Sequence, residues 1–282
     1  MIASPAVPKL FDRDALRAHR ARAQRSGPVG FLFERVADDL SDRLAVVLRQ
    51  FQHGVNLGGS GLSLREALEG RVARLDNIDL LARDDDDLNL ADASIDLAVS
   101  VLTLQFADDV PGLMSQLRRA LKPDGLFIAA MLGGDTLTEL RQSFAVAEVE
   151  VEGGLSPRVS PFADLRDAGV LLQRAGFALP VADLERIVVR YDNVFGLMRD
   201  LRGMGAANAL IARRRAPLRR ATLLRMAEVY AERFSDPDGR IRATFDCIWL
   251  SGWSPHDSQQ KPLKPGSAKQ SLEQAVKGRC DK

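Results

Sequence analysis

A cluster of glycines, Asn56-Leu-Gly-Gly-Ser-Gly61, is the stretch whose residue types and spacing point most directly to chemistry. Glycine allows the backbone to turn with positive φ and lets a ligand approach the main chain closely. An apolar run, 51–55, precedes the cluster, and a segment with helical character, 63–70, follows it. A helix that begins after such a turn presents free N–H groups and the positive end of its dipole. The pattern therefore predicts either a nucleotide-type ligand site or a plain tight turn.

A second set of residues could complete such a site. The segment 72–76 is predicted as a short strand that ends in Asp76. In folds that bind dinucleotides or nucleosides, an acid at this point accepts hydrogen bonds from the ribose hydroxyls. The run 84–87 consists of four aspartates, whose mutual repulsion predicts a solvated loop. One of these carboxylates could instead accept a hydrogen bond from an adenine amino group.

Three further carboxylates, Asp135, Glu139 and Glu148, lie near the ends of expected strands. Carboxylates bind a guanidinium group as bidentate acceptors, so these side chains are candidates for contact with a cationic substrate. The alternative is that they cap or decorate a helix predicted over 137–152. The structural role is the interpretation that we favour from the sequence.

Histidines and cysteines indicate no metal site. The three histidines, His19, His53 and His256, do not occur in a His-x-Asp/Glu pattern, so an iron site of two histidines and one carboxylate is not predicted. The two cysteines, Cys247 and Cys280, are far apart and fit neither a disulfide framework nor a zinc site. This usage is typical of a reduced compartment, and we expect a cytoplasmic protein.

The elements that must position these residues alternate along the chain. Continuous apolar runs at 95–102 and 125–131 are typical of strands that are buried on both faces. An amphipathic helix is predicted over 109–121, between the two runs. This alternation predicts an α/β fold with a parallel, doubly wound sheet. Before the first strand, hydrophobic residues at helical spacing predict two helices within 8–50.

Composition and length set the domain organisation. The chain has 282 residues, is 46% hydrophobic and carries a net charge of +1, which does not indicate a nucleic-acid-binding surface. No apolar run is long enough for a transmembrane segment. We divide the chain into an N-terminal helical cap (1–50), an α/β domain with helical insertions (51–253) and a disordered tail (254–282).

Several stretches together resemble class I S-adenosylmethionine-dependent methyltransferases, namely the glycine turn, 95–100 and 121–127. Five other motifs, at 131–141, 152–157, 160–162, 203–208 and 252–259, are more specific. They resemble the respiratory complex I assembly factor of methyltransferase fold, whose mitochondrial member is described as a protein-arginine hydroxylase. They also resemble its alphaproteobacterial homologues, often labelled as relatives of the biotin-pathway malonyl-carrier-protein methyltransferase. The resemblance covers residues 10–260.

The resemblance implies a Rossmann-like methyltransferase sheet with an S-adenosylmethionine cleft at the carboxyl ends of its strands. It places three glycines, Asp76, Asp84 and Leu102 in this cleft. The glycines would approach the methionine part, Asp76 would bind the ribose, Asp84 would lie beside the adenine, and Leu102 would line the cleft after the strand. The three glycines are Gly58, Gly59 and Gly61.

Two departures from the family pattern affect this implied site. The family has an acid two positions before the glycine turn, whereas this chain has Asn56, which lacks the charge to hold a cationic amino group. Only 22 residues separate Gly61 from Asp84. This is too few for the usual helix, strand, helix and strand, because one βαβ unit alone needs about 30 residues. We therefore expect part of the second and third strand region to be missing, and S-adenosylmethionine to bind weakly or not at all.

Two classes of function remain open at this stage. One is an enzyme of methyltransferase fold that modifies an arginine of a complex I subunit, or methylates a carboxyl group of a small molecule. The other is a non-catalytic assembly protein with a degenerate cofactor site. Asp135, Glu139, Arg141 and Trp253 are the candidate contacts with the substrate or protein partner; Trp253 could equally be the end of the last strand folding over the core. The partner implied by the resemblance places the protein in the cytoplasm, at the inner face of the respiratory membrane.

Overall fold

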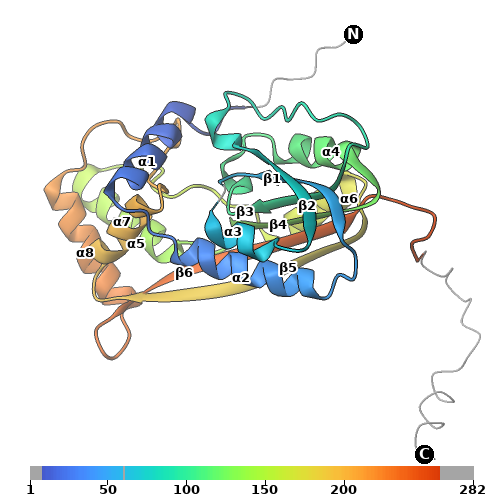
Figure 1. The fold of residues 1–282 in the computed structure, drawn as a ribbon. Helices are drawn as coiled ribbons and strands as arrows, with labels where there is room; N and C mark the ends of the chain where they lie inside the picture. Colours follow the sequence, from blue (N-terminus) through green and yellow to red (C-terminus); the bar gives the residue numbers. More distant parts are fainter. Residues whose placement is uncertain (1–7, 60, 261–282) are drawn as a thin grey trace, which may run out of the picture.

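One mixed sheet organises the chain. The computed structural model describes residues 8–59 and 61–260, and its six strands lie in the order β2-β1-β3-β4-β6-β5 (Figure 1). The first four strands in this order run parallel to one another, and β6 is antiparallel to both β4 and β5. The strands are β1 (Phe51–Leu57), β2 (Val72–Ile78), β3 (Ile95–Val101), β4 (Leu121–Gly133), β5 (Ala178–Tyr191) and β6 (Ile241–Trp253). The predicted Rossmann-like α/β class is thus confirmed, whereas the prediction of a parallel sheet is wrong for β6, which runs antiparallel to both of its neighbours.

Among the described residues, the sheet ends at β2 and lacks a further strand on this side. Between β2 and β3 the described chain holds one turn of 3₁₀ helix, η1 (Leu80–Ala82), and no further strand. The expectation that part of the second and third strand region is missing agrees with this topology. As a consequence β2 is an edge strand that is only partly buried, whereas every residue of β3 is buried.

Helices cover both faces of the sheet. One face carries α4 (Val110–Ala120) and α6 (Leu165–Arg174), whose apolar residues share a core with alternate residues of the strands. The opposite face carries α2 (Phe31–Ala45) and the short α3 (Leu62–Ala67). Alternate residues of the buried strands point to opposite faces, which is why these apolar runs support two cores.

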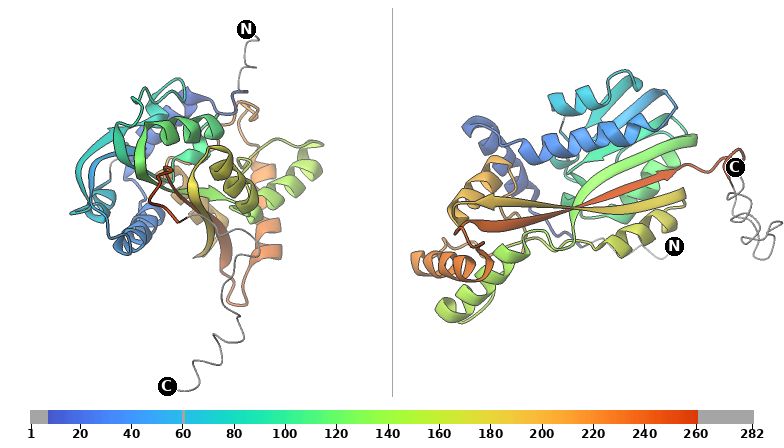
Figure 2. Two further views of the ribbon diagram at one scale, coloured as in Figure 1. Left: turned by 90° about the vertical axis from the view of Figure 1, so that its right-hand side faces the viewer. Right: turned by 90° about the horizontal axis from the view of Figure 1, so that it is seen from below.

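A third core lies beyond the rest of the sheet. Figures 1 and 2 show β5 and β6 continuing as a long pair toward a group of helices at one end of the molecule. These helices are α5 (Thr138–Glu152), α7 (Val194–Gly203) and α8 (Arg220–Phe234). They bury Phe144, Leu197 and Tyr230 against Ala243 and Phe245 of β6.

Helix α1 (Arg13–Ser26) bridges the segment after the edge strand β2 and the helices beyond the sheet, because it contacts both η1 and α7. Its first turn is capped by Asp12, which accepts a hydrogen bond from the backbone N–H of Ala15. At the other end of the sheet, Ser254 continues β6 with backbone hydrogen bonds to Gly125 and Asp124. Of the predicted tail, 261–282 lies outside the described residues. No helix among the described residues is long and apolar enough to span a membrane.

Candidate functional site

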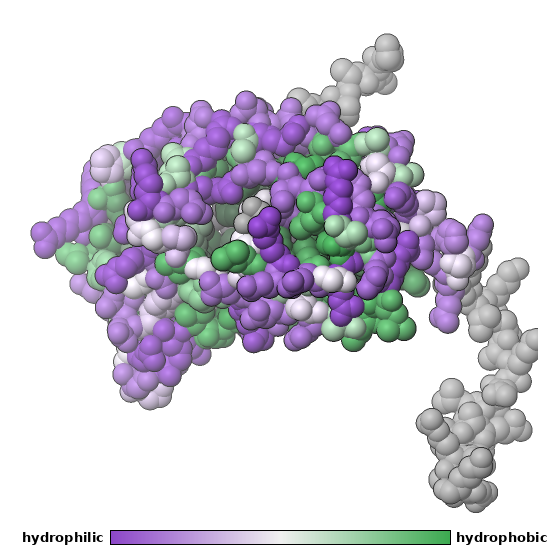
Figure 3. Space-filling model, viewed as in Figure 1, coloured by the Kyte–Doolittle hydropathy of each residue, from purple (hydrophilic) through white to green (hydrophobic). Residues whose placement is uncertain are grey.

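A cavity of about 690 Å³ opens at the carboxyl ends of β1, β2 and β3. It is the hollow near the centre of the surface in Figure 3. The sheet side of its wall includes four of the predicted residues, the three glycines of the turn and Leu102. Ligands of open α/β sheets bind in this place, outside the carboxyl ends of the strands. The three glycines are Gly58, Gly59 and Gly61.

Two residues of this wall have backbone conformations that side chains rarely adopt. Gly58 has φ 134°, and a Cβ built on it would lie 2.2 Å from Oγ1 of Thr103. Only glycine therefore allows the turn after β1 to pass so close to Thr103, which follows Leu102 after β3. Leu102 has φ 49°, and Nε2 of Gln105 donates a hydrogen bond of 2.8 Å to its carbonyl oxygen. A strained non-glycine residue at a cavity wall is typical of a functional site.

Asn56 lies behind the glycine turn and does not itself line the cavity. Its side chain is buried, and Nδ2 donates to Oδ1 of Asn77 at 3.0 Å and to the carbonyl oxygen of Gly59 at 3.3 Å. Asn56 Oδ1 is buried without a hydrogen-bond partner among the described residues. The amide thus fixes the turn onto β2, a role that needs donors and that a carboxylate could not fill.

At the end of β2 the acid that lines the cavity is Asp79, and the predicted ribose acid Asp76 does not line it. The Asp76 carboxylate accepts hydrogen bonds from Nε2 of His53 at 2.8 Å and from Arg74, and these contacts lower its pKa. The strand continues past Asp76, and the residues that reach the cavity are Asn77 and Asp79. The sequence prediction ended the strand two residues too early and so selected an acid that lies before the cavity.

Asp84 is also outside the cavity. Its side chain is 85% exposed and pairs with Arg17 at 2.8 Å, which lowers its pKa. The least exposed acid of the aspartate run is Asp86, which pairs with Arg13 at 2.6 Å and accepts hydrogen bonds from the backbone N–H groups of Asp108 and Asp109. The contacts of Asp86 hold the loop to α1 and do not reach a ligand site.

The N-terminal helices form the opposite wall of this cavity. Arg20 of α1 pairs with Asp79 at 2.7 Å, and both line the cavity. Phe33 of α2 lies against the turn, since a Cβ on Gly61 would be 3.0 Å from its ring. Glu34 follows it and also lines the cavity. No sequence pattern indicates the three side chains from α1 and α2, because their position depends on how these helices pack.

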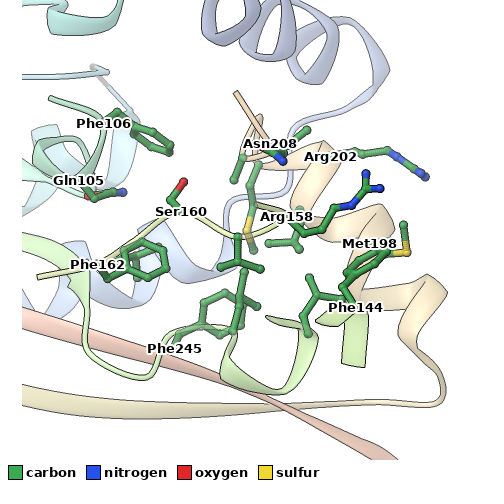
Figure 4. A pocket seen from close by; sticks show the side chains of 18 of the residues that line it. Gln105, Phe106, Phe144, Arg158, Ser160, Phe162, Met198, Arg202, Asn208 and Phe245 are labelled. Carbon is green, nitrogen blue, oxygen red and sulfur yellow. The ribbon is translucent and has the colours of Figure 1, made fainter. Parts of the chain in front are cut away.

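A second, smaller cavity of about 260 Å³ adjoins the first (Figure 4). Phe106 and Met204 line both cavities and so form their common wall. The lining of the second cavity is mainly apolar and aromatic. It includes Leu132, Leu140, Phe144, Phe162, Met198 and Phe245.

The loop 203–208 connects the two cavities. Gly203, Met204 and Gly205 line the first, and Met204 together with 206–208 lines the second. Gly205 has φ 72°, and a Cβ built on it would lie 3.2 Å from Cα of Arg20, so glycine allows α1 to pack directly on this loop. This loop is the motif 203–208 that the family resemblance singled out in the sequence.

A buried ion pair supports the second cavity from the side of α5. The Glu148 side chain, 2% exposed, accepts hydrogen bonds from the guanidinium of Arg158 and from the backbone N–H of Ser156 at 2.8 Å. The same guanidinium lies 5.4 Å from the ring centre of Phe144. In Figure 4 the Arg158 and Arg202 heads point away from the middle of the cavity, which leaves an apolar interior.

The four predicted contacts with a substrate or partner line neither cavity. Asp135 pairs with Arg186 at 2.7 Å, and Glu139 is buried where it accepts hydrogen bonds from Thr244. Neither acid caps α5, whose N-cap Leu137 has no side-chain hydrogen bond in the described chain; both instead make structural contacts with β5 and β6, so the alternative of capping does not hold for these two.

Arg141 and Trp253 are likewise engaged elsewhere. Arg141 is exposed and donates to the carbonyl oxygen of Ser160 at 3.2 Å. Trp253 pairs in register with Leu126 and Ala178, at the opposite end of the sheet from the glycine turn. Within the described ranges no group of three or more His, Cys, Asp or Glu side chains could hold a metal ion.

Comparison with known proteins connects this geometry to a family. Residues 48–129 match the methyltransferase domain family. The arginine-hydroxylase NDUFAF5 of Rattus norvegicus, a mitochondrial protein, is 38% identical over 287 residues, which cover 94% of this chain and 83% of the relative. The malonyl-[acyl-carrier protein] O-methyltransferase of Laribacter hongkongensis is 39% identical over 187 residues, covering 66% of this chain and 60% of that protein.

Solved structures agree with the fold. The YcgJ protein of Bacillus subtilis superposes with a TM-score of 0.50 at 12% identity, covering 77% of this chain and 98% of that protein. At this identity the similarity concerns the fold alone. The identity to NDUFAF5 over most of both chains is high enough to show the family: the chain belongs to the arginine-hydroxylase NDUFAF5 family, within the class I S-adenosylmethionine-dependent methyltransferases.

Proposed function

We propose that this protein binds S-adenosylmethionine in the cavity at the glycine turn and modifies an arginine side chain of a protein partner, a subunit of respiratory complex I, during assembly. The observation that carries the proposal is the pair of adjoining cavities that share Phe106 and Met204. One has room for a nucleoside cofactor, and the other for a single long side chain. We place the activity in the cytoplasm, at the inner face of the respiratory membrane, because the proposed partner belongs to a membrane-bound complex.

The residues of the first cavity fit the cofactor. Its volume, about 690 Å³, is within the range of roughly 300–1,000 Å³ that is usual for ligand sites. Gly59 and Gly61 let a ligand approach the backbone of the turn, and Asp79 at the end of β2 is placed to accept hydrogen bonds from ribose hydroxyls. S-adenosylmethionine, when bound, supplies an activated methyl group on a sulfonium.

The second cavity suits the stem of an arginine. Phe144, Phe162 and Phe245 offer apolar surface to its methylene groups, which long cationic side chains bury while the charged head remains solvated or paired. The common wall at Phe106 and Met204 would then receive the head. Two groups that meet at this boundary are positioned reactants and need no bimolecular encounter, which is the main requirement for group transfer.

A second candidate function is that of an assembly protein that holds its partner without modifying it. Two observations favour it: Asn56 replaces the usual acid, and the sheet lacks the strand that would extend the adenosine wall. Methyl transfer to a malonyl-carrier protein is a third candidate function, and testing it would require that carrier protein as the substrate.

The test is a modification assay with a matched pair of glycine variants. The purified protein is incubated with S-adenosylmethionine and with complex I subunits from a strain that lacks this gene, and arginine-containing peptides are read by high-resolution mass spectrometry. The increments of a methyl group and of an oxygen atom are resolved, so the reaction type is read directly. Gly59→Asp places a carboxylate in the first cavity, whereas Gly154→Asp projects into open space.

The proposal expects an arginine modification that appears with the wild type and with Gly154→Asp and disappears with Gly59→Asp. Modification that persists in Gly59→Asp would overturn the assignment of the first cavity. Complementation of assembly by Gly59→Asp without any modified arginine would favour the non-catalytic function.

A further inference from the structure

Three charged side chains line the described part of the first cavity, and two of them come from the N-terminal helices. They are Arg20 of α1, Glu34 of α2 and Asp79 at the end of β2. The methyltransferase sheet itself contributes only Asp79. The charge that the family places on the first strand is absent here, because that position is Asn56.

We infer that Arg20 and Glu34 bind the amino-acid end of the cofactor, with Arg20 taking its α-carboxylate and Glu34 its α-ammonium group. The inference rests on the proposed function and assigns to α1 and α2 the charged contacts that neither the glycine turn nor the uncharged Asn56 supplies. The helical cap is then a part of the cofactor site.

Arg20 is placed to reach the glycine turn. Its Nη1 donates to Oδ1 of Asp79 at 2.7 Å, and its Nη2 lies 3.8 Å from the position of a Cβ on Gly59. The guanidinium thus spans from the end of β2 to the turn. Its Nε and Nη2 have no acceptor in the described part of the chain, so one edge of the planar donor group remains for a carboxylate. A carboxylate bound on that edge would leave Asp79 in place for the ribose.

The backbone beneath Arg20 is fixed by close packing. Gly205 lies against Cα of Arg20, where a Cβ would be 3.2 Å away. His19, the preceding residue, shares a hydrogen bond of 3.2 Å with the carbonyl oxygen of Ala207. The loop that joins the two cavities therefore positions the arginine that we assign to the cofactor.

Glu34 supplies the negative charge that Asn56 lacks. It lines the cavity in the first turn of α2, and within 8–59 and 61–260 its carboxylate has no ion pair. Oε1 lies 2.7 Å from the position of a Cβ on Gly30, so glycine at the N-cap lets the carboxylate fold back over the helix start. An unpaired carboxylate at a cavity wall is a suitable acceptor for an ammonium group.

The test compares two ligands that differ only at the amino-acid end. S-adenosylhomocysteine carries the α-carboxylate and α-ammonium groups, and 5′-methylthioadenosine keeps the adenine, ribose and thioether without them. We expect Arg20→Gln and Glu34→Gln each to lower the affinity for S-adenosylhomocysteine by about tenfold or more in calorimetric titration. Each variant removes a charge-assisted hydrogen bond. Their affinity for 5′-methylthioadenosine should change less than about twofold, because that ligand makes no such bond.

Matched controls separate this role from an effect on folding. Arg17→Gln removes an arginine of the same helix that pairs with Asp14 and Asp84 and does not line the cavity, so both affinities should remain unchanged. Asp79→Asn should lower the affinity for both ligands, because both contain the ribose. If Arg20→Gln does not fold, Arg20→Lys keeps the charge but loses the planar fork, and should weaken only S-adenosylhomocysteine.

The outcomes are distinguishable. Equal weakening of both ligands by the Arg20 and Glu34 variants would overturn the inference and leave the cofactor assignment in place. Wild-type protein that binds 5′-methylthioadenosine as tightly as S-adenosylhomocysteine would likewise overturn the inference and leave the cofactor assignment in place. Wild-type protein that binds neither ligand would overturn the proposed cofactor, and this inference with it.

Discussion

Loss of the Arg158 guanidinium should destabilise the protein strongly, because Glu148 would remain as an unpaired buried charge. The Glu148 side chain is 2% exposed and that of Arg158 is 15% exposed. The Nε of Arg158 donates to Glu148 at 2.7 Å, and the only other residue that donates to this carboxylate in the described chain is Ser156, through its backbone N–H. Removing one partner of a buried pair costs about 3–5 kcal/mol. The lost contact with the Phe144 ring adds about 0.5–1 kcal/mol.

The assay is urea unfolding of Arg158→Met at neutral pH, with a double variant and a surface control. In Glu148→Leu/Arg158→Met the buried charge is absent, and replacing a buried pair by apolar residues is often neutral, so most of the lost stability should return. Arg141→Met removes an exposed arginine of the same region and should change the free energy of unfolding by no more than about 0.5 kcal/mol. A loss below about 1 kcal/mol in Arg158→Met, or a double variant as unstable as the single one, would refute this reasoning.

Three further predictions concern single residues. Gly58→Ala should lower stability by about 1–3 kcal/mol and weaken S-adenosylhomocysteine, because φ is 134° and Thr103 leaves no space for a Cβ; an unchanged melting temperature would contradict this. Burial raises the pKa of Asp246, but the hydrogen bonds from Arg186 and from a backbone N–H lower it more, so that the folded pKa is below the ordinary value. The stabilisation is therefore present above about pH 4 and is lost as the pH falls further. In Asp246→Asn the free energy of unfolding, measured with urea, should fall less steeply below this pH than in the wild type. An equally steep fall would exclude the mechanism. Burial raises the pKa of the Cys247 thiol to about 12, so a thiol reagent at about pH 8 should label it only after denaturant is added, as peptide mapping would show.

The fold could be read from the sequence because its strongest signals are local. The apolar runs that became β3 and β4 are buried along most of their length, and the helix between them has the predicted periodicity. The loss of a strand at the β2 edge followed from the family pattern together with chain length, since the 22 residues between Gly61 and Asp84 cannot hold the elements that the pattern places there. Length and periodicity are properties of a segment by itself, and no tertiary contact was needed to interpret them.

The candidate site could be predicted only where it depends on the backbone. The glycines and Leu102 line the first cavity, as their position after a strand indicates. Asp76 does not line it, because β2 continues to Ile78 and a later acid, Asp79, follows its end. Arg20 and Glu34 could not be found, because nothing in a helix rich in charged residues reveals which side chain will face a cavity formed by a sheet farther along the chain.

The position of β6 between β4 and β5 has a consequence for folding of the nascent chain. The first four strands can pair as they emerge, but the backbone N–H and C=O groups along the free edge of β4 stay unpaired until residues 241–253 have been synthesised and inserted. Long-range pairing of this kind is slow, and an open apolar edge is prone to aggregation while it waits. The yield of native protein should therefore depend on translation speed and on chaperones, even though β6 covers this edge in the finished sheet.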